Sequence, residues 1–248
     1  MRIDIITIFP ELFRQVFEFG IIRRAREKRL VDIYTHDLRR WTHDRHRTTD
    51  DAPYGGGPGM VMKVDLLVEA VEEVSGKDCR DEDRVVLLLS PRGEMLRQAK
   101  VREWTRTRQL VLVAGRYEGV DERFAELTGA QEVSIGDYVL SGGEIPAMVV
   151  VDAVARLLPG AISDPESARQ DSFSRGLLDH PHYTRPAEFR GLRVPDVLLS
   201  GNHAAIRRWR KEQAVRTTRA RRPELLGEAV MDQEERSLLE QCEEVSTN

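Results

Sequence analysis

Two short apolar runs decide the fold class of this chain: Val85-Val-Leu-Leu-Leu-Ser-Pro-Arg-Gly93 and Leu110-Val-Leu-Val-Ala-Gly115. Both lack the alternation of apolar and polar side chains that marks a strand with one face in water. They predict strands 85–89 and 110–114, buried in the centre of a parallel sheet. Each run ends at a turn signal, and about a dozen residues between them (93–106) favour a helix.

The segments on either side continue this pattern. Residues 2–9 alternate β-branched and polar side chains and predict a strand, and residues 31–36 predict another. Helices are predicted from Pro10 onward, over 64–74 and over 145–158, because apolar residues recur there at helical spacing. Strands that alternate with helices and are themselves buried predict an α/β fold.

The texture of the sequence changes between Pro159 and Gly176, where serine and proline replace periodic apolar residues. Such a stretch is typical of a linker. We therefore expect a first domain over 1–162, a flexible linker over 163–175 and a smaller domain over 176–248. The smaller domain has helical patterns at 202–218 and 232–244, and no strand of note is expected in it.

Composition excludes several classes of protein. Hydrophobic residues make up 40% of the 248 residues and charged residues 32%, which suits a folded core rather than disorder. The longest apolar run, at 145–158, is too short for a membrane span, and no export signal begins the chain. Cys79 and Cys242 lie far apart, which excludes a disulfide framework and a cysteine zinc site. A soluble cytoplasmic protein without a membrane partner is expected.

The net charge of −4 conceals one strongly basic segment. Residues 207–222 carry eight arginine and lysine side chains, opposed only by Glu212, and an acidic tail follows over 224–248. A basic block in an acidic protein indicates a polyanion partner. The alternative is a solvated helix face balanced by the acidic tail, and charge alone does not decide between them.

Four loops hold more glycine and polar residues than a connection requires: 42–60, 90–93, 115–123 and 134–146. Two of them follow predicted strands, and open α/β sheets bind ligands beyond the carboxyl ends of their strands. Each loop alone also fits a tight turn, but the loops at 90–93, 115–123 and 134–146 together favour a ligand site. The first loop lacks the Lys-Ser/Thr pair of a phosphate-binding loop, which excludes a nucleotide hydrolase of that class.

Two features have competing interpretations. His43 and His46 have a spacing that suits a metal ion, but no third ligand is apparent. Asp171 stands in the predicted linker, where it could cap the next helix or act as a carboxylate that closes over a substrate. Physical reasoning alone favours the cap.

Taken in order, the motifs closely resemble the bacterial tRNA (guanine-N1)-methyltransferases of the TrmD family. The resemblance runs from residue 1 to about residue 228 and keeps the family's spacing. It rests on His43-Asp-Arg-His-Arg-Thr48, Tyr54-Gly-Gly-Gly-Pro-Gly-Met60, Gly115-Arg-Tyr-Glu-Gly-Val-Asp-Glu-Arg123, Ser134-Ile-Gly-Asp-Tyr-Val-Leu-Ser-Gly-Gly-Glu144, Gly176-Leu-Leu-Asp-His-Pro-His-Tyr-Thr-Arg-Pro186 and Leu198-Leu-Ser-Gly-Asn-His-Ala204.

The resemblance implies a SPOUT fold with a deep trefoil knot in the mainly parallel sheet, and a helical C-terminal domain that binds tRNA. It implies that the first domain binds S-adenosyl-L-methionine and that the methyl group goes to N1 of guanosine 37, next to the anticodon. A homodimer with active sites shared between the chains is implied, together with magnesium for the chemical step. The metal ligands stay unassigned.

By position in these motifs, the resemblance assigns Asp171 as the general base and Arg156 as the catalytic arginine. Glu118 and Asp179 match acidic residues near the amino group of the donor or the metal. The other donor-binding residues are expected to be Pro91, Gly93, Gly115, Arg116, Tyr117, Ser134, Ile135, Gly136, Asp137, Tyr138, Val139, Leu140, Gly142, Gly143 and Pro146. RNA is expected on His203, Arg207, Arg208, Arg210 and Lys211.

These roles suit the chemistry. N1 of guanine carries a proton at neutral pH, which a carboxylate such as Asp171 can accept as the methyl group arrives. Negative charge then grows towards O6, where the guanidinium of Arg156 would stabilise it. Two alternatives remain open: a SPOUT methyltransferase acting on another RNA position, and a non-catalytic RNA-binding protein. The carboxylate argues against a ribose methyltransferase, and intact donor loops argue against a silent adaptor.

Overall fold

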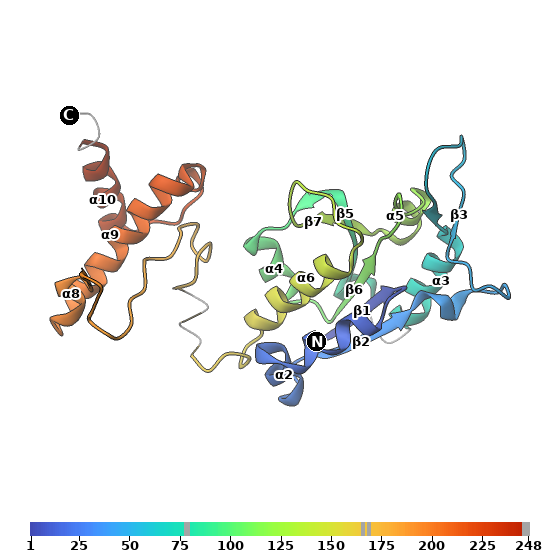
Figure 1. The fold of residues 1–248 in the computed structure, drawn as a ribbon, viewed down its shortest axis with the longest axis horizontal. Helices are drawn as coiled ribbons and strands as arrows, with labels where there is room; N and C mark the ends of the chain where they lie inside the picture. The colour runs from blue at the N-terminus through green and yellow to red at the C-terminus, as the bar shows by residue number, and fades with distance from the viewer. Residues whose placement is uncertain (77–79, 165–166, 168–169, 245–248) are drawn as a thin grey trace. The chain divides into compact units, whose positions relative to one another are not determined.

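The computed structural model describes residues 1–76, 80–164, 167 and 170–244. The chain divides into two units, Met1–Ser163 and Asp164–Asn248 (Figure 1). Cys79 and residues 165–166 and 168–169 of the predicted linker lie outside the described residues. No helix in the described part of the chain has the length and apolar character needed to cross a membrane.

A parallel five-stranded sheet forms the centre of the first unit, in the order β2-β1-β6-β5-β7. Its strands are β1 (Arg2–Thr7), β2 (Asp32–Asp37), β5 (Arg84–Met95), β6 (Gln109–Ala114) and β7 (Gln131–Ser134). The middle strand, β6, is buried at every residue, as its continuous apolar run predicts. The predicted α/β fold with a mainly parallel sheet is thus confirmed.

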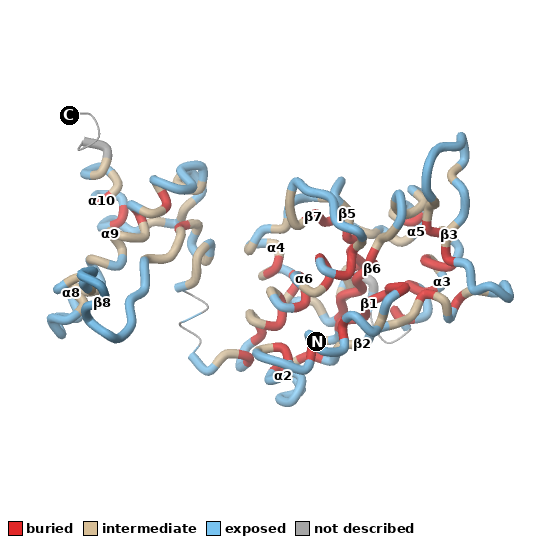
Figure 2. Tube along the Cα trace, viewed as in Figure 1, coloured by how far each residue is buried: buried red, intermediate tan, exposed pale blue. Residues whose placement is uncertain are grey.

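Helices cover both faces of this sheet. The first face carries α1 (Glu11–Arg14), the 3₁₀ turn η1 (Val16–Glu18), α2 (Gly20–Glu27), α4 (Gln98–Trp104) and α6 (Glu144–Leu157). The second carries η2 (Leu38–Trp41), α3 (Val64–Ser75) and α5 (Arg123–Thr128), and η3 (Asp81–Asp83) precedes β5. Ile3 and Ile5 of β1 join the first core cluster, whereas Ile6 joins the second. The buried strands stand out in Figure 2.

The region after the first apolar run differs from its prediction. The strand does not end at the Ser90-Pro91 turn signal but continues to Met95, with an irregular register between Leu89 and Glu94. The partner for this extension is β7, whose four residues are too few to show a period in the sequence. The helix predicted over 93–106 is therefore confined to α4.

The helix predicted from Pro10 is also broken into shorter pieces, α1 and η1, before α2 begins at Gly20. The first glycine-rich loop is the tip of a hairpin, because β3 (Asp50–Asp51) and β4 (Val61–Met62) pair antiparallel on either side of it. Three consecutive glycines from Gly55 to Gly57 have positive φ, which side chains with a Cβ rarely adopt.

The second unit is mostly helical. It contains α8 (Asp196–Leu199), α9 (His203–Arg221), η4 (Pro223–Gly227) and α10 (Gln233–Glu244), and buried Val215 and Leu238 lie in α9 and α10. The expectation of no strand beyond residue 176 is wrong, because β8 (Glu188–Phe189) and β9 (Leu192–Arg193) form a small hairpin. Two-residue strands show no alternation in the sequence, and only Arg190-Gly191, both at positive φ, marks the turn.

Candidate functional site

A pocket of about 330 Å³ opens where the carboxyl-terminal parts of β5, β6 and β7 come together. Its walls come from residues 88–92, from the loop after β6 and from the loop after β7, with α6 closing one side. Most of the predicted donor-binding residues line it: Pro91, Gly115, Arg116, Tyr117, Glu118, Ser134, Ile135, Gly136, Tyr138, Val139, Leu140, Gly142, Gly143 and Pro146.

Three predicted donor-binding residues do not line this pocket. Gly93 is a packing residue, since a Cβ on it would lie 2.2 Å from the backbone nitrogen of Val133 in the neighbouring strand. Asp137 is exposed beside the pocket, and Asp179 belongs to the second unit. Sequence reasoning missed the other residues that line the pocket, most of which lie in β5 or β7. They are Leu88, Leu89, Ser90, Arg92, Gly119, Val120, Glu132, Val133 and Ser141.

Backbone contacts hold two walls of the pocket together. The N–H of Gly143 donates to the carbonyl of Gly115 (2.8 Å), and Arg116 pairs with Gly142 in an isolated antiparallel bridge. A Cβ on Gly143 would lie only 2.7 Å from Cα of Ala114, so a glycine is needed for this approach. The two loops meet here at main-chain distance, and the missing side chains of Gly115, Gly142 and Gly143 leave the backbone uncovered along the pocket.

The first glycine-rich loop reaches the same region. The N–H of Glu118 donates to the carbonyl of Met60 (3.0 Å), and a Cβ on Gly59 would lie 2.3 Å from Oε1 of Glu118. Next to it, Tyr117 adopts φ +61°, a left-handed conformation that costs free energy for a residue with a Cβ. The loop after β6 is therefore held in an unusual shape by its neighbours.

Arg156 lies far from the pocket of its own chain. It is in the last turn of α6, whereas Pro146, which lines the pocket, is in the first. Ten residues of α-helix separate them, about 15 Å along the helix axis. The pocket and the predicted catalytic arginine are therefore distinct places on one helix.

Asp171 belongs to the second unit. Ser167 and Gln170 are helical, and the N–H of Asp171 donates to the carbonyl of Ser167 (3.1 Å), so Asp171 follows a helical turn. Residues 171–177 form bends and turns without a helix. The interpretation of Asp171 as the cap that begins the next helix is therefore wrong.

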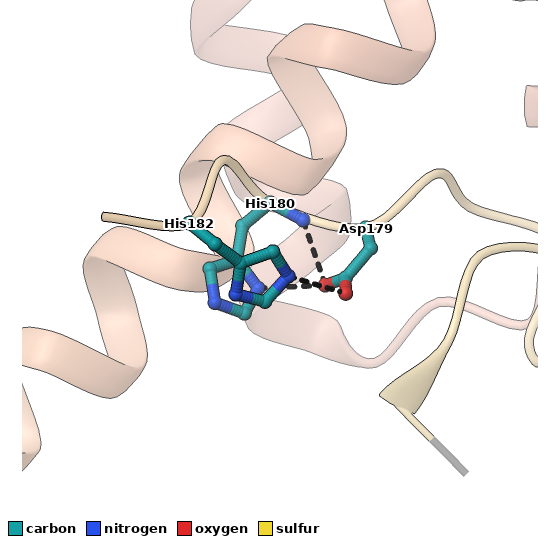
Figure 3. A group of neighbouring side chains, drawn as sticks. All are labelled: Asp179, His180 and His182. Carbon is teal, nitrogen blue, oxygen red and sulfur yellow. Dashed lines mark hydrogen bonds and ion pairs between the residues drawn. The ribbon is translucent and has the colours of Figure 1, made fainter. Parts of the chain in front are cut away.

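Asp179 gathers two histidines, as Figure 3 shows. Its carboxylate lies 2.7 Å from Nδ1 of His180 and 2.9 Å from Nε2 of His182. Burial raises the pKa of Asp179, but hydrogen bonds from His182 and from the N–H of His180 outweigh it, so the net pKa is lowered. Burial lowers the pKa of His180. At neutral pH the pair is thus an ionised carboxylate beside a neutral imidazole.

The same three side chains form a possible metal site. Their ligand atoms lie within 4.8 Å of one another, and no second group of this kind occurs among the described residues. Two imidazoles and one carboxylate suit zinc or a similar transition metal, whereas magnesium takes oxygen ligands. This donor set therefore does not fit the expected magnesium. His43 joins no such group and pairs instead with Glu69 (3.2 Å).

The basic helix α9 presents its charges unequally. Arg207, Arg208 and Arg210 are exposed and have no ion pair with any described residue, and His203 is exposed as well. Lys211 instead reaches two carboxylates at the start of the acidic C-terminal segment, 2.7 Å away in each case: Asp232 and Glu234. The acidic tail thus neutralises one of the cations expected to bind RNA.

Comparison with known proteins gives a consistent result. Residues 1–228 match the family model described as tRNA (Guanine-1)-methyltransferase TrmD. The chain is 51% identical over 241 residues to the tRNA (guanine-N(1)-)-methyltransferase of Dictyoglomus turgidum and 53% identical over 241 residues to that of Pseudomonas fluorescens. Both alignments cover 97% of this chain and 96% of the relative. This chain therefore belongs to the tRNA (guanine-1)-methyltransferase TrmD family.

Proposed function

We propose that this protein transfers a methyl group from S-adenosyl-L-methionine to N1 of guanosine 37 in tRNA. The single observation that carries the proposal is the pocket, which gathers the family's donor motifs from three separate loops at one end of the sheet. Its volume of about 330 Å³ falls in the range of small-molecule sites. A tRNA substrate also supports the expected location in the cytoplasm.

The donor would lie along the glycine-lined walls. Peptide N–H and C=O groups near Gly115 and Gly142 are suited to the hydrogen-bonding edge of an adenine ring, because no Cβ keeps a ligand away from them. Apolar side chains such as Leu140 and Pro146 offer surface to the rest of the nucleoside.

Asp171 would act as the general base and Arg156 as the stabiliser of developing charge. In the reaction the bond between sulfur and the methyl carbon breaks as the bond from that carbon to N1 forms. The N1 proton passes to the carboxylate of Asp171, and neutral S-adenosyl-L-homocysteine leaves. The guanidinium of Arg156 would stabilise the negative charge that grows on O6.

A homodimer would complete the site. Within one chain, Arg156 and the pocket lie at opposite ends of α6. Exposed apolar side chains at i and i+4 on two neighbouring segments of the first unit support a partner surface: Leu12, Val16, Ile145 and Val149. We propose that the pocket of one chain works with Asp171 of the partner subunit, and that the sheet carries the deep trefoil knot of the SPOUT class.

The second unit would hold the RNA. The guanidinium groups of Arg207, Arg208 and Arg210, which form no ion pair with a described residue, suit phosphates, which give affinity without reading sequence. An unpaired anticodon loop can turn a base outward at modest cost, which brings N1 within reach. Magnesium is an expectation from the resemblance, and no step above depends on it. Among the described residues of one chain, no three Asp or Glu side chains come together at ligand spacing.

The test is methylation of an unmodified tRNA transcript with guanosine at position 37, followed by identification of the modified nucleoside. The expected product is 1-methylguanosine, absent when adenosine replaces that guanosine. A 2′-O-methylated nucleoside would favour a different SPOUT activity. Donor and tRNA binding without any methylated product would favour the non-catalytic RNA-binding alternative.

A further inference from the structure

Glu144 is a buried carboxylate with a direct link to the pocket. It begins α6 and is only 1% exposed. Its Oε1 accepts a hydrogen bond from the hydroxyl of Thr7 at the end of β1 (2.9 Å), and its Oε2 accepts one from Nε of Arg116 (3.0 Å). Arg116 itself lines the pocket, so one carboxylate joins the end of β1, the first turn of α6 and the loop after β6.

The two partners of this carboxylate, Thr7 and Arg116, are themselves held by further contacts. The hydroxyl of Thr7 also accepts a hydrogen bond from the N–H of Phe9 (2.9 Å), and the guanidinium of Arg116 lies 4.5 Å from the centre of the Phe9 ring. The N–H of Arg116 donates to the sulfur of Met62 (3.1 Å). Arg116 is thus held by the carboxylate of Glu144, by the ring of Phe9 and by the hydrogen bond from its own N–H to Met62.

Gly142, two residues before Glu144, leaves room for this ion pair. A Cβ on Gly142 would lie 2.3 Å from Nε of Arg116 and 2.6 Å from Oε2 of Glu144. The absence of a side chain at Gly142 therefore serves the pair as well as the pocket. A carboxylate in the first turn of α6 is also favoured by the helix dipole.

Breaking such a contact is expected to move the pocket wall. A buried carboxylate without partners is strongly disfavoured, and an arginine that loses its partner turns towards water. Residues 115–118 include Arg116, and their backbone contains the left-handed Tyr117, whose conformation depends on its neighbours. The loop therefore has a reason to relax once Arg116 is released.

We propose that Glu144 is a positioning residue, which holds Arg116 and with it residues 115–118 in the conformation that receives the methyl donor. This inference rests on the proposed function, because it takes the pocket to be the donor site. Glu144 touches no reacting atom in this scheme. It acts through Arg116.

The chain offers a matched control in Asp4. Asp4 is also a buried carboxylate with an arginine partner, since Arg2 donates to it (2.7 Å), and Nε2 of Gln109 donates to it as well (2.7 Å). Its network lies near the amino end of β1, whereas Thr7 and Glu144 lie at the carboxyl end. A change at Asp4 should affect folding without touching the pocket.

The experiment compares Glu144→Gln with Asp4→Asn in the full-length protein. Binding of unreactive S-adenosyl-L-homocysteine is measured by calorimetry, and KM for the donor, kcat and the midpoint of thermal unfolding are measured beside it. Glu144→Gln should weaken binding and raise the donor KM by at least about tenfold, the effect of losing a hydrogen bond to a charged group, and change kcat less than threefold. Asp4→Asn should lower the midpoint but leave binding within about twofold.

Thr7→Val provides a milder second variant should Glu144→Gln fold poorly. It removes one hydrogen bond to Glu144 and keeps the contact with Arg116, so a weakening of about threefold to tenfold is expected. The proposal is overturned if a variant at Glu144 or Thr7 loses thermal stability while donor KM and binding stay within twofold of wild type. If the wild-type protein binds no S-adenosyl-L-homocysteine, the proposed donor site itself fails, which is a distinguishable result.

Discussion

The candidate donor pocket in the first unit depends on loops that approach one another at main-chain distance, whereas the candidate RNA surface in the second unit depends on exposed charged side chains. Gly115 and Gly143 meet at main-chain distance, and the strands beneath them are buried. Arg207 and Arg208, in contrast, stand exposed on α9 with no ion pair to any described residue. Packing shapes the pocket and charge shapes the RNA surface. Substitutions in the pocket should therefore change donor affinity, and substitutions on α9 should change tRNA affinity.

The largest effect is expected at Asp171, the proposed general base in the second unit. Asp171→Asn keeps the size of the side chain but cannot accept the N1 proton, so the single-turnover rate should fall by about 10²- to 10⁴-fold. Donor affinity should not change, because the pocket belongs to the first unit. Rapid-quench methylation and calorimetry check the two halves of this prediction. A rate within a few-fold of wild type would remove Asp171 from the catalytic scheme.

The next largest effect is expected at Gly143, where two walls of the pocket approach each other closely. Gly143→Ala would place a Cβ 2.7 Å from Cα of Ala114 and should weaken donor binding by about ten- to a hundredfold, the usual cost of overpacking. tRNA affinity should stay the same. Gly227→Ala is the control, since nothing lies within 4 Å of a Cβ there. Equal donor affinity in both variants would mean that the close approach of the loops does not shape the donor site.

A smaller effect separates free from paired cations on α9. The slope of log affinity against log salt is negative. If Arg207 and Arg208 each hold a phosphate, replacing both by glutamine should make that slope shallower by about 0.9 per contact. Lys211→Gln should change it less, because Lys211 must first leave Asp232 and Glu234. Binding of tRNA across a salt series measures this. The same slope for wild type and both variants would make α9 a solvated face.

The smallest effect concerns Asp4, near the amino end of β1, and the dependence of stability on pH. Burial raises the pKa of Asp4, but hydrogen bonds from His36, Arg2 and Gln109 outweigh it, so the net pKa lies below the ordinary value of 3.8. Its contribution to stability is complete above the pKa of the unfolded chain and is lost as the pH falls through the folded pKa. Asp4→Asn should therefore reduce the free energy of unfolding at neutral pH and flatten its decline in acid. Urea unfolding at neutral pH and at about pH 3 tests this, and parallel declines in both proteins would contradict it.

The sequence predicted the parts of the fold that carry a long, regular signal. The buried runs at 85–89 and 110–114 and the helices at 64–74 and 145–158 lie in β5, β6, α3 and α6 with only their ends displaced. β7 was missed because four residues show no period, and β5 extends past a proline because β7 supplies a partner. Tertiary pairing overrode a local turn signal in this case.

The pocket was predictable from motifs, whereas its internal support was not. The glycine loops were recognisable in sequence, and most of their residues line the pocket. The bond between Thr7 and Glu144 joins residues 137 positions apart, a contact that no local pattern reports. In the same way, nothing near Gly93 in the sequence separates a glycine needed for strand packing from one that faces a ligand.

The most direct test of the central claim, that the donor pocket of one chain works with Asp171 of the partner subunit, mixes two defective chains. Asp171→Asn retains the pocket, and Gly143→Ala retains the base. After exchange verified by mass spectrometry of differently tagged chains, half of the dimers carry one of each, and one of their two sites is intact. Recovery of about a quarter of wild-type methylation is the predicted result for a two-fold dimer with shared sites. Activity no higher than the sum of the two defective proteins, with exchange verified, would contradict it.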